Sequence, residues 1–274
     1  LSMTISEQNL RDMYLDIMQD VLTNEIYKDP PLTQDRSFSK KVKGVLGLKK
    51  RHRLGRGYDE DNREKGLDWP SVAHTMIGRK RMSNLRYVLS DVIENNVAGD
   101  FVETGVWRGG ACIFARAIMK SYGVTDRTVW VADSFAGLPE PDADKYEADK
   151  GDKHHTVDAL AVSRTQVENN FRVYGLLDEQ VKFLVGWFKD TLPAAPIDQV
   201  AVLRLDGDMY ESTMDAIKAL YQKVTPGGYV IVVDYHAVEG CRKAVHDYLN
   251  EYAKDETVDI QEIDGTGVFW QRKI

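Results

Sequence analysis

The chain of 274 residues carries 43 acidic and 36 basic side chains, which gives a formal net charge of −7 at neutral pH. This acidic balance argues against a nucleic-acid-binding protein and favours a small-molecule partner. No run of about 18 apolar residues occurs, so we expect no transmembrane span. Cys112 and Cys241 lack the spacing of a disulfide framework, and no secretion signal follows Met3. Both features predict a cytoplasmic protein.

Residues 1–98 predict a helical extension in front of a main domain at residues 99–274. Apolar residues recur at helical spacing from Ser6 to about Tyr27, and Ser6 is suited to cap that amphipathic helix. Its apolar positions are Leu10, Met13, Tyr14, Ile17, Met18 and Val21. The helices of this extension also offer a surface for a homo-oligomer.

Two charged segments predict loops. Within residues 37–67, eight lysines and arginines lie between positions 40 and 56, and an acidic cluster follows at 59–61. A basic run can bind nucleic acid, but the acidic remainder of the chain favours a solvated, mobile loop. The segment 139–158 is also rich in charge, and we expect both segments to move as a lid and to determine ligand specificity.

Two more helices are expected before the main domain. One covers residues 71–77 and ends near Gly78. The other places Leu85, Val88, Leu89 and Val92 at helical spacing, which indicates a buried face.

Residues 100–111 predict a buried strand, a glycine turn and the start of a helix. Gly105, Gly109 and Gly110 allow a ligand to approach the backbone, and the N-terminus of the helix presents its N–H groups and positive dipole end. Glu103 lies just before the first glycine, where it suits a ligand with an ammonium or sulfonium group better than a pyrophosphate. The alternative is a tight strand–helix turn that binds nothing.

Strands and helices alternate through the rest of the chain. The expected strands are Thr128–Ala132, Val181–Val185, Gln199–Leu205 and Tyr229–Val233, followed by an antiparallel hairpin of Val258–Ile263 and Val268–Gln271. This alternation predicts an α/β fold with a mostly parallel, doubly wound sheet and sites at the carboxyl ends of its strands. Because the terminal hairpin is the methyltransferase variation of the Rossmann plan, we predict a Rossmann-like class I methyltransferase fold.

Three carboxylates follow expected strands and are candidates for binding. Asp133 can accept hydrogen bonds from the ribose hydroxyls of an adenosine ligand, or else cap a turn. Asp206 and Asp234 close neighbouring strands and would repel each other unless a cation or a proton lies between them. A hard divalent ion completed by water and substrate oxygens satisfies this pair. Solvated surface acids are the alternative.

Four motifs together resemble the macrocin O-methyltransferase family. They are Glu103-Thr104-Gly105-Val106-Trp107-Arg108-Gly109-Gly110, His74-Thr75-Met76-Ile77-Gly78, Leu205-Asp206-Gly207-Asp208 and Gly186-Trp187-Phe188-Lys189-Asp190. The similarity extends from about Trp69 to the C-terminus. It implies a metal-dependent enzyme that uses S-adenosylmethionine to methylate sugar hydroxyls on macrolide and aminocoumarin natural products.

The resemblance also assigns roles to single residues. It implies that the cofactor is bound by Thr75, Met76, Glu103, Thr104, Gly105, Gly109, Gly110, Asp133, Ser134, Trp187, Phe188, Lys189 and Asp206. Within this set, Thr75 and Met76 with Glu103 and Gly105 would lie at the methionine end. Asp133 and Ser134 would bind the ribose, and the turn at 187–189 the adenine. Asp206 would be both a magnesium ligand and the general base, with Asp234 as the second metal ligand and a glycosylated small molecule as the acceptor.

One departure from the family pattern concerns the metal. The family usually reads Asp-Asp-Tyr where this chain has Val233-Asp234-Tyr235, so one expected ligand is missing. His236 lies close by, although a surface position suits it better. Two other functions therefore stay open: methylation of a catechol-type small molecule by the same metal chemistry, and a cofactor-binding protein without catalysis.

Overall fold

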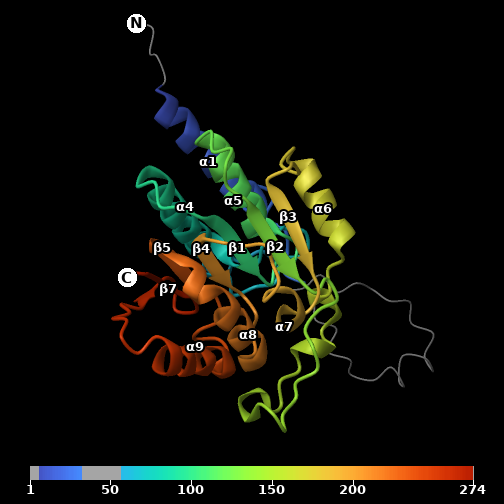
Figure 1. Cartoon of the computed structure of the whole chain (residues 1–274). Helices are drawn as coiled ribbons and strands as arrows, with labels where there is room; N and C mark the ends of the chain where they lie inside the picture. The colour runs from blue at the N-terminus through green and yellow to red at the C-terminus, as the bar shows by residue number, and fades with distance from the viewer. Residues whose placement is uncertain (1–5, 33–56, 274) are drawn as a thin grey trace, which may run out of the picture.

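The computed structural model describes residues 6–32 and 57–273 and contains a seven-stranded sheet with the order β3-β2-β1-β4-β5-β7-β6 (Figure 1). The strands are β1 Asp100–Thr104, β2 Val129–Asp133, β3 Val181–Val185, β4 Val200–Leu205, β5 Val224–Val232, β6 Gln261–Glu262 and β7 Val268–Gln271. Strands β1 to β5 run parallel, whereas β7 is antiparallel to both β5 and β6. The predicted class I methyltransferase sheet is confirmed.

Helices cover both faces of the sheet and create two apolar clusters. They are α1 Glu7–Leu22, α3 Glu60–Lys65, α4 Gly78–Glu94, α5 Gly110–Ser121, α6 Arg164–Val173, α7 Phe188–Thr191, α8 Tyr210–Leu220 and α9 Glu239–Tyr252. In β1, Phe101 packs in the cluster with α1, α4 and α5, while Val102 packs in the cluster with α8 and α9 (Figure 1). No described helix is long and apolar enough to cross a membrane.

Helix α1 begins as predicted but presents a different face to the core. The Ser6 side chain accepts a hydrogen bond from the Asn9 N–H and caps the helix. Leu15, Met18 and Leu22 are buried. Four of the apolar positions expected from the sequence face solvent instead: Leu10, Met13, Tyr14 and Ile17, of which Ile17 is 57% exposed.

The prediction of a helix over residues 71–77 is wrong. This stretch is an irregular loop, and α4 begins only at Gly78. Its backbone groups are bound by distant side chains rather than by one another, which removes the hydrogen bonds that a helix needs. Residues 37–56 of the predicted basic loop lie outside the described residues, and the part that follows contains α3.

Candidate active site

A cavity of about 430 Å³ lies at the carboxyl ends of the parallel strands. The residues that follow β1, β2, β3, β4 and β5 all contribute to its lining, as expected for an open α/β sheet. The predicted site residues on the lining are Thr75, Met76, Glu103, Gly105, Asp133, Ser134, Trp187, Phe188, Lys189, Asp206 and Asp234. Most of the site proposed from the sequence therefore converges on one cavity.

Three of the predicted cofactor residues lie behind the cavity wall. Thr104 is fully buried, and Gly109 and Gly110 do not line the cavity. The Gly110 N–H donates to the His74 carbonyl oxygen at 3.0 Å, so the first N–H group of α5 is bound within the protein rather than directed at a ligand. A Cβ at Gly110 would stand 2.4 Å from that same oxygen. These residues shape the backbone around the cavity.

Gly105 is required by a close approach between two strands. Its φ is +87°, and a Cβ there would meet the Asp206 carbonyl oxygen at 1.8 Å. Only glycine allows the turn after β1 and the turn after β4 to touch at this point. This contact brings Gly105 and Asp206 to neighbouring positions on the lining, although they are distant in the sequence.

Asp133 sits at the end of β2 with both oxygens fixed. Oδ2 accepts from the Val106 N–H at 2.8 Å, and Oδ1 accepts from the Phe135 N–H at 2.7 Å. Burial raises the pKa of the Asp133 carboxyl, although these two hydrogen bonds oppose the rise. Each carboxylate oxygen has a second lone pair, so Asp133 can still accept a hydrogen bond from a hydroxyl group of a ligand.

A buried ion network connects Glu103 on β1 with Asp206 after β4. Arg204 forms an ion pair with Glu103, and its Nη1 also donates to Asp206 Oδ2 at 2.9 Å. Cys112 Sγ donates to the other oxygen of Glu103 at 2.7 Å. Burial and the charge of Asp206 raise the pKa of Glu103 to about 7, although Arg204 acts in the opposite direction. Glu103 lines the cavity as predicted, but the protein already pairs it with a cation.

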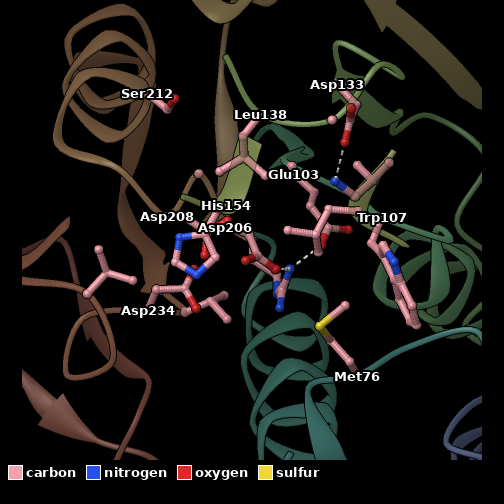
Figure 2. A pocket seen from close by; sticks show the side chains of 18 of the residues that line it. Met76, Glu103, Trp107, Asp133, Leu138, His154, Asp206, Asp208, Ser212 and Asp234 are labelled. Carbon is pink, nitrogen blue, oxygen red and sulfur yellow. Dashed lines mark hydrogen bonds and ion pairs between the residues drawn. The ribbon is translucent and has the colours of Figure 1, made fainter. Parts of the chain in front are cut away.

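The carboxyl groups of Asp206, Asp208 and Asp234 lie together on the side of the cavity opposite Asp133 (Figure 2). Burial and the charge of Asp206 raise the pKa of Asp208 to about 7. Burial and the charges of Asp208 and Asp206 likewise raise the pKa of Asp234, whose Oδ2 is buried and has no hydrogen-bond partner among the described residues. Positive charge or protons in this part of the cavity would relieve the repulsion.

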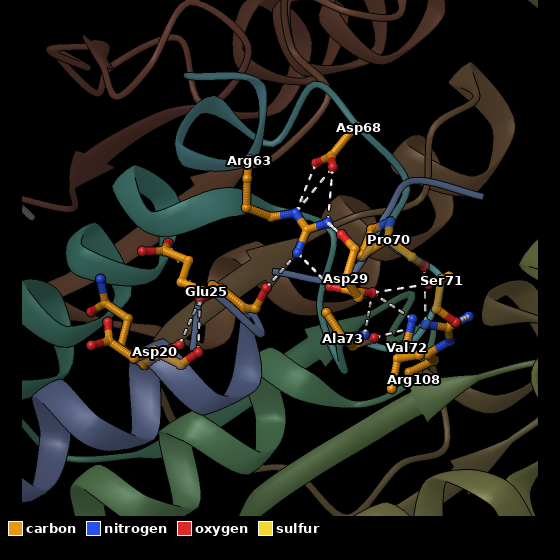
Figure 3. A network of polar contacts seen from close by, with 12 residues as sticks. Asp20, Glu25, Asp29, Arg63, Asp68, Pro70, Ser71, Val72, Ala73 and Arg108 are labelled. Carbon is orange, nitrogen blue, oxygen red and sulfur yellow. Dashed lines mark hydrogen bonds and ion pairs between the residues drawn. The ribbon is translucent and has the colours of Figure 1, made fainter. Parts of the chain in front are cut away.

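Two side chains hold the loop that carries Thr75 and Met76 (Figure 3). Asp29, only 7% exposed, accepts from the N–H groups of Val72 at 2.6 Å and Ala73 at 3.2 Å. On the other side of the loop, Arg108 donates to three of its carbonyl oxygens at 2.8 to 3.2 Å. The loop that carries Thr75 and Met76 is thus positioned by Asp29, far away in the sequence, and by Arg108 in the glycine turn.

Arg63 on α3 keeps Asp29 in place. Its guanidinium is 1% exposed, donates to Asp29 Oδ1 at 2.7 Å and pairs with Asp68 at 2.9 Å. It also donates to the Thr23 carbonyl oxygen at 2.8 Å. Burial acts to raise the pKa of Asp29, but hydrogen bonds from Arg63 and the Val72 N–H outweigh it, so that pKa is lowered. Asp29 is therefore ionised at neutral pH.

The segment 139–160 crosses the cavity and is anchored at two points. The Asp149 carboxylate, 3% exposed, accepts from the N–H groups of Tyr210 at 2.6 Å and Glu211 at 3.0 Å at the start of α8. Trp107 Nε1 donates to the Ala159 carbonyl oxygen at 2.9 Å. For residues 139–158 the sequence predicts almost no aliphatic anchor, and the anchors that the structure shows are polar.

Comparison with known proteins identifies the family. A family described as macrocin-O-methyltransferase (TylF) matches residues 11–272. The chain is 51% identical over 265 residues to an 8-demethyl-8-(2,3-dimethoxy-alpha-L-rhamnosyl)-tetracenomycin-C 4'-O-methyltransferase of Streptomyces olivaceus, with 96% of this chain and 94% of that protein covered. It is also 51% identical over 261 residues to a demethyldecarbamoylnovobiocin O-methyltransferase of Streptomyces niveus, with 95% and 93% covered. The solved structure of the O-methyltransferase NovP superposes with a TM-score of 0.86 at 49% identity, with 96% of this chain and 100% of that one covered.

The chain belongs to the macrocin O-methyltransferase family. It is therefore an O-methyltransferase, and membership implies S-adenosylmethionine as the methyl donor. The family resemblance read from the four sequence motifs is confirmed.

Sequence reasoning missed several residues of this macrocin-type O-methyltransferase site. Arg204 could have been noticed, because an arginine inside the buried strand β4 requires a buried partner. Asp208 belongs to a motif that was recognised, yet its burial beside Asp206 follows only from the fold. The contribution of His154 to the lining has no local sequence signal, since it depends on how the segment 139–160 docks.

Proposed function

We propose that this enzyme transfers a methyl group from S-adenosylmethionine to a hydroxyl group on the sugar of a glycosylated natural product. The observation that carries the proposal is the 51% identity, over nearly the whole chain, to two enzymes whose names specify a rhamnosyl tetracenomycin and demethyldecarbamoylnovobiocin as acceptors. The cavity supports it, because one half presents groups suited to an adenosine and the other presents carboxyl groups suited to a polyol.

The cofactor would extend along the ends of β1, β2 and β3. We place its methionine end near Thr75 and Met76, with Glu103 and Gly105 beside it, as the family resemblance implies; all four line the cavity. The donor is a cation, and the Glu103–Arg204–Asp206 network carries a net charge of −1 when both carboxylates are ionised. A buried network with that charge favours a cationic ligand over a neutral one.

The ribose and adenine ends would follow in the same direction. Asp133 and Ser134 would accept and donate hydrogen bonds to the ribose hydroxyls, while the turn at 187–189 would cover the adenine. Trp187 is 38% exposed and lines the cavity, as a side chain that covers a planar ring should. In this arrangement Thr104, Gly109 and Gly110 act through the shape of the backbone.

Asp206 and Asp234 are the proposed ligands of a magnesium ion. The unpaired, buried Oδ2 of Asp234 and the mutual repulsion of the carboxyl groups fit a hard divalent cation. Among the described residues, no group of three or more His, Cys, Asp or Glu side chains is arranged to hold a metal, so water and acceptor oxygens would have to complete the shell. When bound, such an ion lowers the pKa of an acceptor hydroxyl.

Asp206 is also the proposed proton acceptor. Arg204 holds Oδ2 and fixes the orientation of the carboxylate, which leaves Oδ1 available to the acceptor hydroxyl. The hydroxyl oxygen then forms a bond to the methyl carbon as the bond from that carbon to sulfur breaks, and its proton passes to Asp206. A positioned base of this kind contributes roughly 10²–10⁴-fold to the rate.

A transfer assay tests this function. The purified protein is incubated with S-adenosylmethionine and either demethyldecarbamoylnovobiocin or the 2,3-dimethoxyrhamnosyl tetracenomycin, and products are identified by mass spectrometry. We expect one added methyl group on the sugar of at least one acceptor, with loss of transfer after chelation and recovery with magnesium. Cofactor binding by calorimetry without methylation of any glycoside would instead support a binding protein or a catechol-type enzyme.

A second copy of the chain is the proposed partner of α1. Its exposed apolar positions, Leu10, Met13, Tyr14 and Ile17, are spaced three and four residues apart and form one stripe. A stripe of this kind is typical of helix pairing. Light scattering should give the mass of a dimer or larger assembly for the native chain and of a monomer after Met13→Lys and Ile17→Lys; a monomeric native chain would contradict the proposal.

A further inference from the structure

His154 faces the half of the cavity that holds the acidic groups. It is the one histidine among the described residues that line this cavity, and it lies in a short 3-10 turn, His154–Thr156. Figure 2 shows its imidazole ring in the part of the cavity that holds Asp206, Asp208 and Asp234, away from Asp133, and Asp208 is near enough to interact with it electrostatically. The side chain is 35% exposed, so it is accessible to a ligand that enters the cavity.

Asp152 fixes the imidazole ring by two hydrogen bonds. His154 Nδ1 lies 2.7 Å from Asp152 Oδ2, and the His154 backbone N–H donates to Oδ1 at 2.8 Å. Because a carboxylate only accepts, Nδ1 carries the proton, and in the neutral ring the lone pair is then on Nε2. Nε2 makes no hydrogen bond with any described residue, and because His154 lines the cavity, Nε2 of the neutral ring is available to accept from a ligand there.

The anchors of the segment 139–160 support this orientation of the ring. Asp149 caps α8 only three residues before Asp152, and Trp107 holds the segment at Ala159. A ring that is already oriented loses little conformational entropy when it binds a ligand, so its hydrogen bond contributes more to affinity and to specificity.

We propose that His154 contacts the acceptor: its Nε2 accepts a hydrogen bond from a second sugar hydroxyl, next to the one that is methylated. The inference rests on the proposed function for its substrate class. A free hydroxyl can donate to Nε2, whereas a methyl ether at the same position cannot, and Nε2 then loses its water without gaining a partner. The enzyme therefore prefers sugars whose neighbouring hydroxyl is still free.

A matched pair of acceptors and variants tests this preference. The acceptors are 8-demethyl-8-(α-L-rhamnosyl)-tetracenomycin C and its 3-methoxy derivative, which differ only in the hydroxyl beside the 4' position. We expect wild-type kcat/KM to be about 10- to 100-fold higher for the free rhamnoside. His154→Phe keeps a planar ring without nitrogen and should reduce that ratio to near one, whereas His155→Phe, its neighbour outside the lining, should leave the ratio unchanged.

Nitrogen-15 NMR of the histidine rings tests the inference without turnover. In the protein saturated with S-adenosylhomocysteine, the His154 signal, assigned with His154→Phe, should show the proton on Nδ1. The Nε2 shift should move on addition of the free rhamnoside and not on addition of its 3-methoxy derivative. A proton found on Nε2, or equal kcat/KM values for the two sugars in the wild type, overturns the inference. Absence of transfer to both sugars and to demethyldecarbamoylnovobiocin would refute the proposed function, while the NMR result still decides the role of His154.

Discussion

Replacing Asp29 by asparagine should destabilise the protein and weaken cofactor binding together. The Asp29 carboxylate pairs with buried Arg63 and also accepts two backbone N–H groups of the loop before Thr75. An amide of the same shape must direct its NH₂ group either at the guanidinium or at those N–H donors. Removing one partner of a buried ion pair costs about 3–5 kcal/mol. Since about 1 kcal/mol lowers Tm by roughly 2–4 °C in a chain of this size, we expect a loss of roughly 6–20 °C.

Calorimetric titration of S-adenosylmethionine is the second measurement for Asp29→Asn. If the loop positions Thr75 and Met76, Kd should rise by about tenfold, the equivalent of one hydrogen bond. Asp20→Asn is the matched control, because Asp20 pairs with Arg79 on the surface, where both side chains are more than one-third exposed (Figure 3). Such a pair contributes about 0–1 kcal/mol. A Tm loss below 1 °C would refute the reasoning, and a large Tm loss with unchanged Kd would show that the network stabilises the fold alone.

The lowered pKa of Asp29 adds a pH dependence to this comparison. Asp29 is a carboxyl whose folded pKa lies below its unfolded value, although burial alone would raise it. Its stabilising effect is complete above the unfolded pKa of about 3.9 and is lost as pH falls through the folded value. The Tm difference between wild type and Asp29→Asn should therefore be constant from neutral pH to about pH 5 and shrink as the pH is lowered below about 4.

Three other predictions concern the acceptor side of the cavity. Asp206→Asn should lower kcat by at least about 100-fold with cofactor Kd changed only a few-fold, and a variant with a tenth of the wild-type rate would contradict the base assignment. Val233 is 1% exposed and packs in an apolar cluster, yet it also lines the cavity. The Val233→Asp variant should have a lower Tm than the wild type without magnesium, and millimolar magnesium should restore its Tm. If magnesium does not restore the Tm, Val233 is a core residue alone. Limited proteolysis should cut the segment 139–160 faster in Asp149→Ala than in the wild type, because the variant lacks the Asp149 anchor. Cofactor and acceptor together should protect the segment from cutting. Equal cutting with and without these ligands would rule out a lid.

The sheet could be predicted because its signals are local. In β1 and β4 nearly every residue is buried, and such short apolar runs between turn residues mark central parallel strands. The turn at Gly105 could be predicted for the same reason, because the positive φ that the turn needs falls on a single residue, which is a glycine. The end of β4 at Leu205 also follows from the sequence, because the mostly apolar run stops before Asp206.

The failures arise where a distant partner decides local structure. The stretch 71–77 has helical periodicity, yet Asp29 and Arg108 take its backbone groups, and neither interaction can be read from the stretch itself. Helix α1 was found, but which apolar residues it buries depends on the faces of α4 and α5. A periodic pattern therefore locates a helix more reliably than it locates the core.

The charges of the cavity fit a reaction that consumes a cation. Glu103, Asp206, Asp208 and Asp234 all line the cavity. Buried Arg204 pairs with Glu103 and Asp206, and the charge of Arg81, which also lines the cavity, acts on Asp234. Burial and mutual repulsion raise the pKa values of three of these carboxyl groups, so ionising them together costs free energy. A sulfonium donor reduces that cost when it binds. Methyl transfer turns the sulfonium into a neutral thioether. Because the carboxylates attract the positive sulfur of the donor but not the neutral sulfur of the product, the product is released more easily.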